Sequence, residues 1–84
     1  MTQRVFNSLD LNQRLYLIVN SGEFISEIVY YGYRIRLYIV NSLYVEVFRN
    51  VHSNDIELVE VLEPEEGRLQ LYAKDIDISE LLEN

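Results

Sequence analysis

The central part of the chain, residues 24–48, alternates apolar and polar side chains with a period of two. Such alternation is typical of β-strands that bury one face. Two pairs of turn-forming residues, Tyr31-Gly32 and Asn41-Ser42, interrupt it and divide it into three strands joined by tight hairpins. A polar turn at residues 51–55 then leads to a fourth apolar stretch at about residues 56–62. The pattern therefore predicts four consecutive strands.

A helical pattern precedes the strands. Asp10 and Gln13 have the spacing of a capping box at a helix start. Asn20-Ser21-Gly22 is expected to end this helix, because it is poor helix material and strand-forming residues follow it. One long helix reaching about Val29 is the alternative, since apolar residues continue at helical spacing to that point. The stripe expected to face the core consists of Leu11, Leu15, Ile18 and Val19.

A second helical pattern follows the strands. Pro64 suits the first position of a helix, with Glu65 and Glu66 in its first turn. Asp77 and Glu80 form a second capping box before a final short turn. The apolar residues at helical spacing are Leu69, Tyr72, Ala73 and Ile76.

The register of the first hairpin follows from its turn. A two-residue loop at Tyr31-Gly32 places Tyr30 opposite Tyr33. This register matches the chemistry of both faces, because it pairs Ile28 with Ile35 and Glu27 with Arg36. Phe24 is expected on the same side as Ile28 and Tyr30.

The second hairpin is expected to turn through three residues, Val40-Asn41-Ser42. A two-residue loop at Asn41-Ser42 would place Leu37 opposite Glu46 and put a charge among aliphatic side chains. The three-residue turn instead pairs Leu37 with Val45 and gives two chemically distinct faces. The expected core face consists of Ile35, Leu37, Ile39, Leu43, Val45 and Val47. The other face carries Arg34, Arg36, Tyr38, Tyr44, Glu46 and Phe48, with Glu27 beside it.

These elements predict an α+β fold, an antiparallel four-stranded meander with an N-terminal helix and a short C-terminal helical segment on one face. Residues 1–84 are expected to form a single domain, because a part of this chain would be too small to bury a core of its own. The inner face of the fourth strand is left open between two sets, Ile56 with Leu58 and Val59 with Val61.

Charge is distributed unevenly along the chain, which has a formal net charge of −7. Residues 1–54 carry five Arg and four acidic residues, a balance of +1, whereas residues 55–84 carry ten acidic and two basic residues, a balance of −8. The absence of Cys excludes disulfides and sulfur-ligated metal sites. The first residues lack the apolar run of a signal peptide and no apolar stretch has the length of a membrane span, which favours a cytoplasmic protein without a membrane partner.

Few residues of the sequence are candidates for a catalytic or metal-binding role. His52 is the single His and has only Asp55 as an acidic neighbour, so we interpret it as a solvated turn residue. The carboxylates from Glu57 to Glu66 are interpreted as a charged strand edge and helix start. Asp75-Ile76-Asp77 has the carboxylate spacing of cation loops but lacks the Gly and distal Glu of a calcium loop. We therefore expect a protein that is not an enzyme and has no cofactor and no bound metal.

The aromatic and basic face is the best candidate for function. We expect it, or an edge strand, to bind a partner protein or a second copy of the chain in a homodimer. The first alternative is a small acidic inhibitor or antitoxin-like protein, in which residues 55–83 neutralise a basic partner. A further alternative is binding of single-stranded nucleic acid by stacking on the sheet, although the net negative charge disfavours it. The expected partner-binding residues are Arg34, Arg36, Tyr38, Tyr44, Glu46 and Phe48.

Three sequence features resemble a set of short bacterial hypothetical proteins. They are residues 32–50 (GYRIRLYIVNSLYVEVFRN), Leu71-Tyr72 and the ending DIDISELL. Those proteins share a G-Y-x-I-x-L-Y hairpin, a Y-V-E-V strand and an ending like I-D-I-S-x-L. The resemblance extends over residues 22–82. It implies a bacterial origin and a compact α+β fold, and it brings no activity or binding residues.

Overall fold

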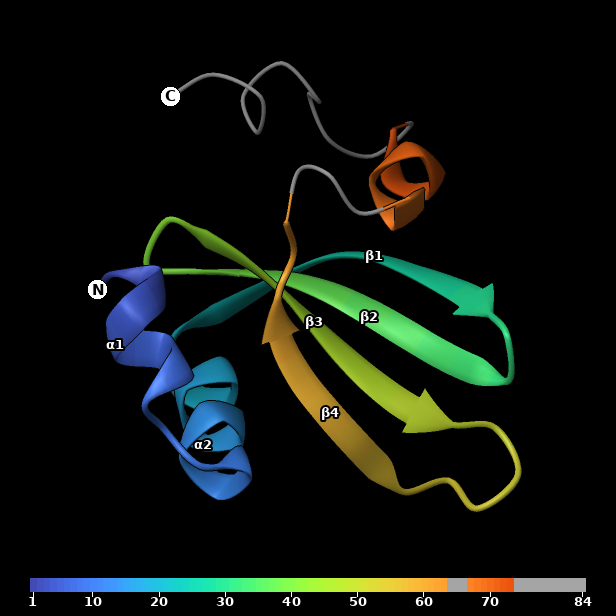
Figure 1. Cartoon of the computed structure of the whole chain (residues 1–84), viewed down its shortest axis with the longest axis horizontal. Coiled ribbons are helices and arrows are strands. Elements are labelled where there is room, and N and C mark those ends of the chain that lie inside the picture. The colour runs from blue at the N-terminus through green and yellow to red at the C-terminus, as the bar shows by residue number, and fades with distance from the viewer. Residues whose placement is uncertain (64–66, 74–84) are drawn as a thin grey trace.

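The structure, a computed structural model, describes residues 1–63 and 67–73 and confirms the α+β class (Figure 1). Two helices, α1 (Gln3–Asn7) and α2 (Leu11–Ser21), precede the strands β1 (Gly22–Tyr30), β2 (Tyr33–Val40), β3 (Leu43–Asn50) and β4 (Ile56–Val61). A 3-10 helix, η1 (Gly67–Tyr72), follows them. The strands form one four-stranded antiparallel sheet in the order β1-β2-β3-β4, which is the expected meander.

Helix α2 begins and ends where the sequence predicts. The Asp10 carboxylate accepts a hydrogen bond from the Gln13 backbone at 2.8 Å, and the Gln13 side chain accepts one from the Asp10 backbone at 2.9 Å. The helix stops at Ser21 and β1 starts at Gly22, so the alternative of one long helix is wrong. A Cβ at position 22 would lie 2.6 Å from the Ile18 carbonyl oxygen, and glycine therefore permits the direct change from helix to strand.

The N-terminal segment adds a short helix that the sequence pattern did not indicate. Thr2 caps α1 by accepting a hydrogen bond from the Val5 backbone, and Phe6 is fully buried. On α2, Ile18 is buried and Leu15 packs beside it, as expected. The other two residues of the expected core stripe, Leu11 and Val19, are exposed.

The first hairpin has the expected register. Tyr30 pairs with Tyr33 across a two-residue turn in which Tyr31 and Gly32 have φ values of 46° and 83°. The predicted side of Phe24 is wrong. A bulge between Phe24 and Ser26 moves Phe24 to the face opposite Ile28 and Tyr30.

The second hairpin does not have the expected register. Asn41 and Ser42 form a two-residue turn with φ values of 46° and 73°, and Val40 pairs with Leu43 across it. Leu37 therefore lies opposite Glu46, in the arrangement that the hydrophobic pattern argued against. The predicted three-residue turn is wrong, and Leu37 and Val45 point to opposite faces of the sheet.

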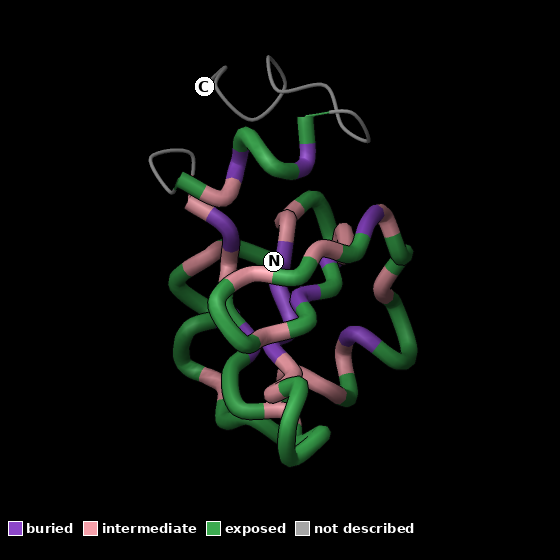
Figure 2. The backbone as a smooth tube through the Cα atoms, turned by 90° about the vertical axis from the view of Figure 1, so that its right-hand side faces the viewer, coloured by how far each residue is buried: buried purple, intermediate pink, exposed green. Residues whose placement is uncertain are grey.

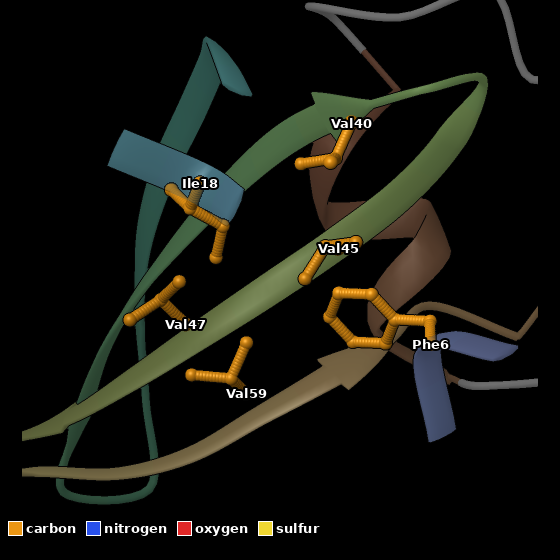
Figure 3. Packing of buried hydrophobic residues seen from close by; sticks show 6 residues of the cluster. All are labelled: Phe6, Ile18, Val40, Val45, Val47 and Val59. Carbon is orange, nitrogen blue, oxygen red and sulfur yellow. The ribbon is translucent and has the colours of Figure 1, made fainter. Parts of the chain in front are cut away.

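The physical reason is that both faces of the sheet are covered. One hydrophobic cluster lies between the sheet and α1 and α2, and it contains Phe6, Ile18, Val40, Val45, Val47 and Val59 (Figure 3). The other lies between the sheet and η1, and it contains Ile35, Leu37, Phe48, Leu62, Leu69 and Tyr72. In β3, four consecutive residues from Val45 to Phe48 are buried, so the strand has no solvent face that alternation could reveal.

The two helical segments consequently lie on opposite faces, and the expectation that both pack on one face is wrong. Figure 2 shows η1 above the other helices and the strands, and two residues of η1 are buried. They are Leu69 and Tyr72, whose spacing of three residues fits one side of a 3-10 turn.

The fourth strand is confirmed, and the structure settles its register. Val59 is buried against the helices, with the partly buried Val61 and Ile56 beside it, whereas Leu58 is on the η1 side and exposed. A bulge at Glu57 allows Ile56 and Val59 to share one face. The expected helix start at Pro64, the second capping box and the Asp75-Ile76-Asp77 motif lie outside the described residues.

A candidate arginine-lined binding cleft

A cleft of about 200 Å³ opens on the helix-bearing face, beside the C-terminal half of α2. Side chains of α2, β3 and β4 form its apolar wall, and Tyr38 and a group of cations complete its lining. The cations are Arg34 and Arg36 of β2 and Arg49 of β3. We call this feature the arginine cleft.

The strand register brings the three arginines together. Arg34 and Arg36 are two residues apart on β2 and share a face, and Arg34 lies directly opposite Arg49 on β3. Like charges in directly opposite positions destabilise a sheet. A second small hollow also has both Arg34 and Arg49 in its lining, so this cationic pair is accessible from two sides.

One carboxylate compensates part of this charge. Glu27 of β1 accepts a hydrogen bond from Arg36 at 2.8 Å and lies 3.8 Å from the Arg34 guanidinium. The hydrogen bond to Glu27, followed by that to Tyr38, raises the pKa of Arg36. Arg49 donates to the Asn54 carbonyl oxygen at 2.7 Å, which adds no negative charge. Within the part of the chain that the structure describes, these contacts set three cations against one anion.

Exposed apolar side chains border the cleft. Val19, at the end of α2, is 83% exposed, and Phe24 of β1 is 53% exposed. The Phe24 ring meets the Tyr38 ring edge-on at 5.8 Å between centroids, and the Arg36 guanidinium lies 5.7 Å from the Phe24 centroid. The border can therefore contact apolar groups while the arginines contact an anion.

Only half of the expected partner-binding residues lie at this cleft. Arg34, Arg36 and Tyr38 are together on the helix-bearing face, with Glu27 beside Arg36 as expected. The other three residues, Tyr44, Glu46 and Phe48, are on the opposite face, so the six form no common surface. Sequence reasoning missed Arg49 and Phe24. The signal for Arg49 was the Asn41-Ser42 dipeptide, because a two-residue turn there places Arg49 opposite Arg34.

On the η1 side, Glu46 joins the sheet to the C-terminal segment. Its fully buried carboxylate accepts two hydrogen bonds from Arg68, at 2.9 and 2.8 Å, and one from the Tyr72 hydroxyl at 2.8 Å. The Arg68 guanidinium also lies 5.1 Å from the Phe48 ring centroid. Burial first, and then the charge of Glu46 and the hydrogen bond to it, raise the pKa of Tyr72. We interpret this Glu46–Arg68–Tyr72 cluster as a structural connection.

A larger groove, of about 500 Å³, lies between α1 and α2. It is lined mainly by apolar residues, among them Met1, Val5 and Tyr16. Asp10 is its one acidic residue, and the capping box of α2 engages that carboxylate. The groove therefore offers apolar contact and no reactive group.

The described residues assemble no group of metal ligands. No three His, Cys, Asp or Glu side chains of residues 1–63 and 67–73 are grouped closely enough to hold a metal ion. His52 lies exposed in the turn after β3, where its backbone donates to the Asn50 side chain at 2.8 Å. None of the described helices combines the length and apolar character needed to cross a membrane.

Comparison of the chain with protein-family models, with curated proteins and with solved structures gives no match. The resemblance to short bacterial proteins therefore stays a prediction, and the function has to be argued from the geometry of the cleft.

Proposed function

We propose that this chain is a non-enzymatic interaction module that binds a partner protein. A carboxylate side chain of that partner enters the arginine cleft. The observation that supports this most directly is that Arg34, Arg36 and Arg49 line one cleft in a chain with a net charge of −7, while the described ion pairs give Arg34 and Arg36 a single carboxylate, Glu27. An opposed Arg34–Arg49 pair costs stability, and such a cost is typical of a binding surface.

The dimensions of the cleft favour a side-chain ligand. A volume of about 200 Å³ is below the usual range for drug-sized ligands, about 300–1,000 Å³, but it accommodates a carboxylate and its methylene groups. Arginine donates paired hydrogen bonds to carboxylates, and Arg34 has only the long contact of 3.8 Å to Glu27 among the described ion pairs. Val19 and Phe24 at the border would contact the apolar neighbours of the inserted residue.

Nucleic acid fits this geometry less well. Stacking on the sheet required Tyr38, Tyr44 and Phe48 on one face, and they are divided between both faces, with Phe48 buried. Phosphate backbones also carry many charges, so the net charge of −7 repels them outside the cleft. A partner with one or a few carboxylates avoids this repulsion.

The test is the binding of a glutamate peptide to the full chain and to two variants of equal net charge. Arg34→Gln removes a cleft cation, and Arg4→Gln removes an exposed cation on α1, away from the cleft. We expect Arg34→Gln to weaken binding about 10–100-fold, the value of hydrogen bonds to a charged group, while Arg4→Gln binds like the parent chain. A glutamine peptide should not bind measurably.

Two results would contradict the proposal. Equal losses in Arg34→Gln and Arg4→Gln would show only a general charge effect. Tighter binding of a single-stranded RNA than of the glutamate peptide, abolished by Arg34→Gln, would replace the protein partner with a nucleic acid. Peptide binding to the cleft should also weaken as ionic strength rises, because the Arg34 side chain is partly exposed and salt screens exposed charges.

The acidic alternative has a separate readout. A lysine peptide that binds equally to the parent chain and to Arg34→Gln would favour a basic partner held by residues 55–83. The described part of that region is already partly engaged, since Glu57 accepts hydrogen bonds from Tyr33 and Asn50 and Glu63 accepts one from Gln3. A cytoplasmic location and a bacterial origin belong to the same proposal.

A further inference from the structure

Strand β1 forms one outer edge of the sheet, and its pairing with β2 determines which of its backbone groups face outward (Figure 1). Tyr30 and Tyr33 close a two-residue hairpin, so they exchange both of their backbone hydrogen bonds. The alternation of an antiparallel pair then directs the backbone groups of Ile28 toward β2 and those of Glu27 and Val29 away from it.

Protected edges are short, or carry charged side chains, Pro, a bulge or a covering element. Within the described residues, β1 has a bulge and Glu23 near its start, whereas its segment from Ser26 to Tyr30 carries only Glu27 as a charge. β1 has nine residues, no Lys and no Pro, and Val29 is 67% exposed. The other outer strand, β4, is shorter, with six residues, and carries Glu57 and Glu60. The β1 bulge lies before Ser26, so the segment from Ser26 to Tyr30 is regular.

We propose that β1 pairs antiparallel with β1 of a second copy of the chain, which extends the sheet across a two-fold axis. Glu27 would lie opposite Val29 of the second copy, since both residues direct their backbone groups outward. This proposal concerns the backbone edge of β1, and it shares with the proposed carboxylate binding only the side chain of Arg34.

Charge complementarity favours a second copy in this register. Cross-strand partners share a face, so Val29 lies beside Arg34 and Glu27 beside Arg36. In the dimer, Glu27 of one copy would therefore lie one strand beyond the Val29–Arg34 pair of the other. Arg34 is 3.8 Å from its own Glu27, half exposed, and its long side chain can turn toward the second carboxylate. The register that sets Glu27 opposite Glu27 is less favourable, because like charges in directly opposite positions repel each other.

The size of the chain also supports pairing of β1 with a second copy. A domain of 84 residues buries a smaller share of its surface than a larger one, and pairing two β1 strands would cover the exposed Val29 at the edge. Glu27 and Val29 would each gain the backbone hydrogen bonds that a strand edge otherwise makes with water.

Sedimentation of the full chain from micromolar to millimolar concentration tests this, with Val29→Pro and Val29→Thr as a matched pair. Proline lacks the outward N–H of position 29 but removes no hydrogen bond to β2, whereas threonine keeps the N–H and the side-chain shape. We expect dimers for the parent chain and for Val29→Thr, and monomers for Val29→Pro. A parent chain that sediments as a monomer throughout, or a dimer that persists in Val29→Pro, overturns the proposal.

Amide hydrogen exchange of the parent chain gives an answer that needs no variant. On dilution, the protection of the Glu27 and Val29 amides should decrease with the dimer fraction while that of Ile28 stays constant. Protection independent of concentration at all three amides overturns the proposal. A negative result here would not contradict carboxylate binding in the arginine cleft, because that proposal is tested by peptide binding to Arg34→Gln. Absence of peptide binding would likewise not contradict a dimer seen by sedimentation.

Discussion

At the scale of single residues, Glu46 has the environment that explains the register of the sheet. A charge in an apolar layer is costly unless it is paired and hydrogen-bonded. Arg68 and Tyr72 supply three hydrogen bonds to its carboxylate, and among the described residues no buried side-chain polar atom lacks a partner. The carboxylate can therefore occupy the face that also holds Leu37.

Removing one partner of the Glu46–Arg68–Tyr72 cluster should lower the free energy of unfolding by more than the value of the lost hydrogen bonds. Arg68→Met keeps much of the side-chain length but leaves Glu46 charged and buried, so we expect the free energy of unfolding to fall by about 3–5 kcal/mol. Tyr72→Phe, which deletes one hydroxyl, should cost less, about 1.5–3 kcal/mol. Urea unfolding measures both, with Arg4→Met on exposed α1 as the control. Equal midpoints for Arg68→Met and Arg4→Met would contradict this account.

The raised pKa of Tyr72 makes stability fall at alkaline pH. The unfolded chain releases the Tyr72 proton near the ordinary value of about 10, whereas the folded chain retains it. The unfolded state then binds fewer protons, so the contribution is complete below that pH and decreases as the pH rises above it. Urea midpoints measured across this range should decline more steeply for the parent chain than for Tyr72→Phe. Tyr33, whose pKa is also raised, by Glu57, is present in both proteins and cancels.

At the scale of elements, the sequence was sufficient where a helix or hairpin had one dominant local signal. The capping box of Asp10 and Gln13 fixed the start of α2, and the Tyr31-Gly32 turn fixed the first hairpin. The second hairpin failed because alternation was interpreted as core against solvent, whereas both faces are covered and β3 is buried on both. The same register moved three of the six expected site residues, Tyr44, Glu46 and Phe48, to the opposite face, and it brought the unpredicted Arg49 to the cleft.

The turn between β2 and β3 gives a direct test of the corrected register. Ser42 has a φ of 73°, which is unfavourable for a residue with a Cβ, and the preferred pair in such turns is Asn-Gly. Ser42→Gly should therefore raise the free energy of unfolding by about 0.5–1 kcal/mol after the greater flexibility of the unfolded glycine is included. Ser53→Gly, at a turn position without a positive φ, should lower it. A lower urea midpoint for Ser42→Gly would contradict the two-residue turn.

At the scale of the whole molecule, one sheet separates two small hydrophobic clusters. The helix-side cluster and the η1-side cluster take alternate residues of β3, so any disturbance of that strand reaches both. A chain of 84 residues has little apolar surface to divide in this way. The two faces also divide the charges. The helix side carries the cationic cleft, and the η1 side carries the paired Glu46 and Arg68.

The shared strand predicts that the two clusters unfold together. Ile18→Val on the helix side and Ile35→Val on the η1 side delete the same group from two clusters without a common member, and each should cost about 0.5–1.5 kcal/mol. In the double variant the costs should add to within about 0.5 kcal/mol, because the two residues pack in clusters on opposite faces of the sheet, while every amide probe reports one transition. Residue-resolved exchange in urea can follow both clusters. If Ile35→Val lowered the midpoint only for residues packed against η1, the sheet would be unfolding in two layers, and β3 would not couple them.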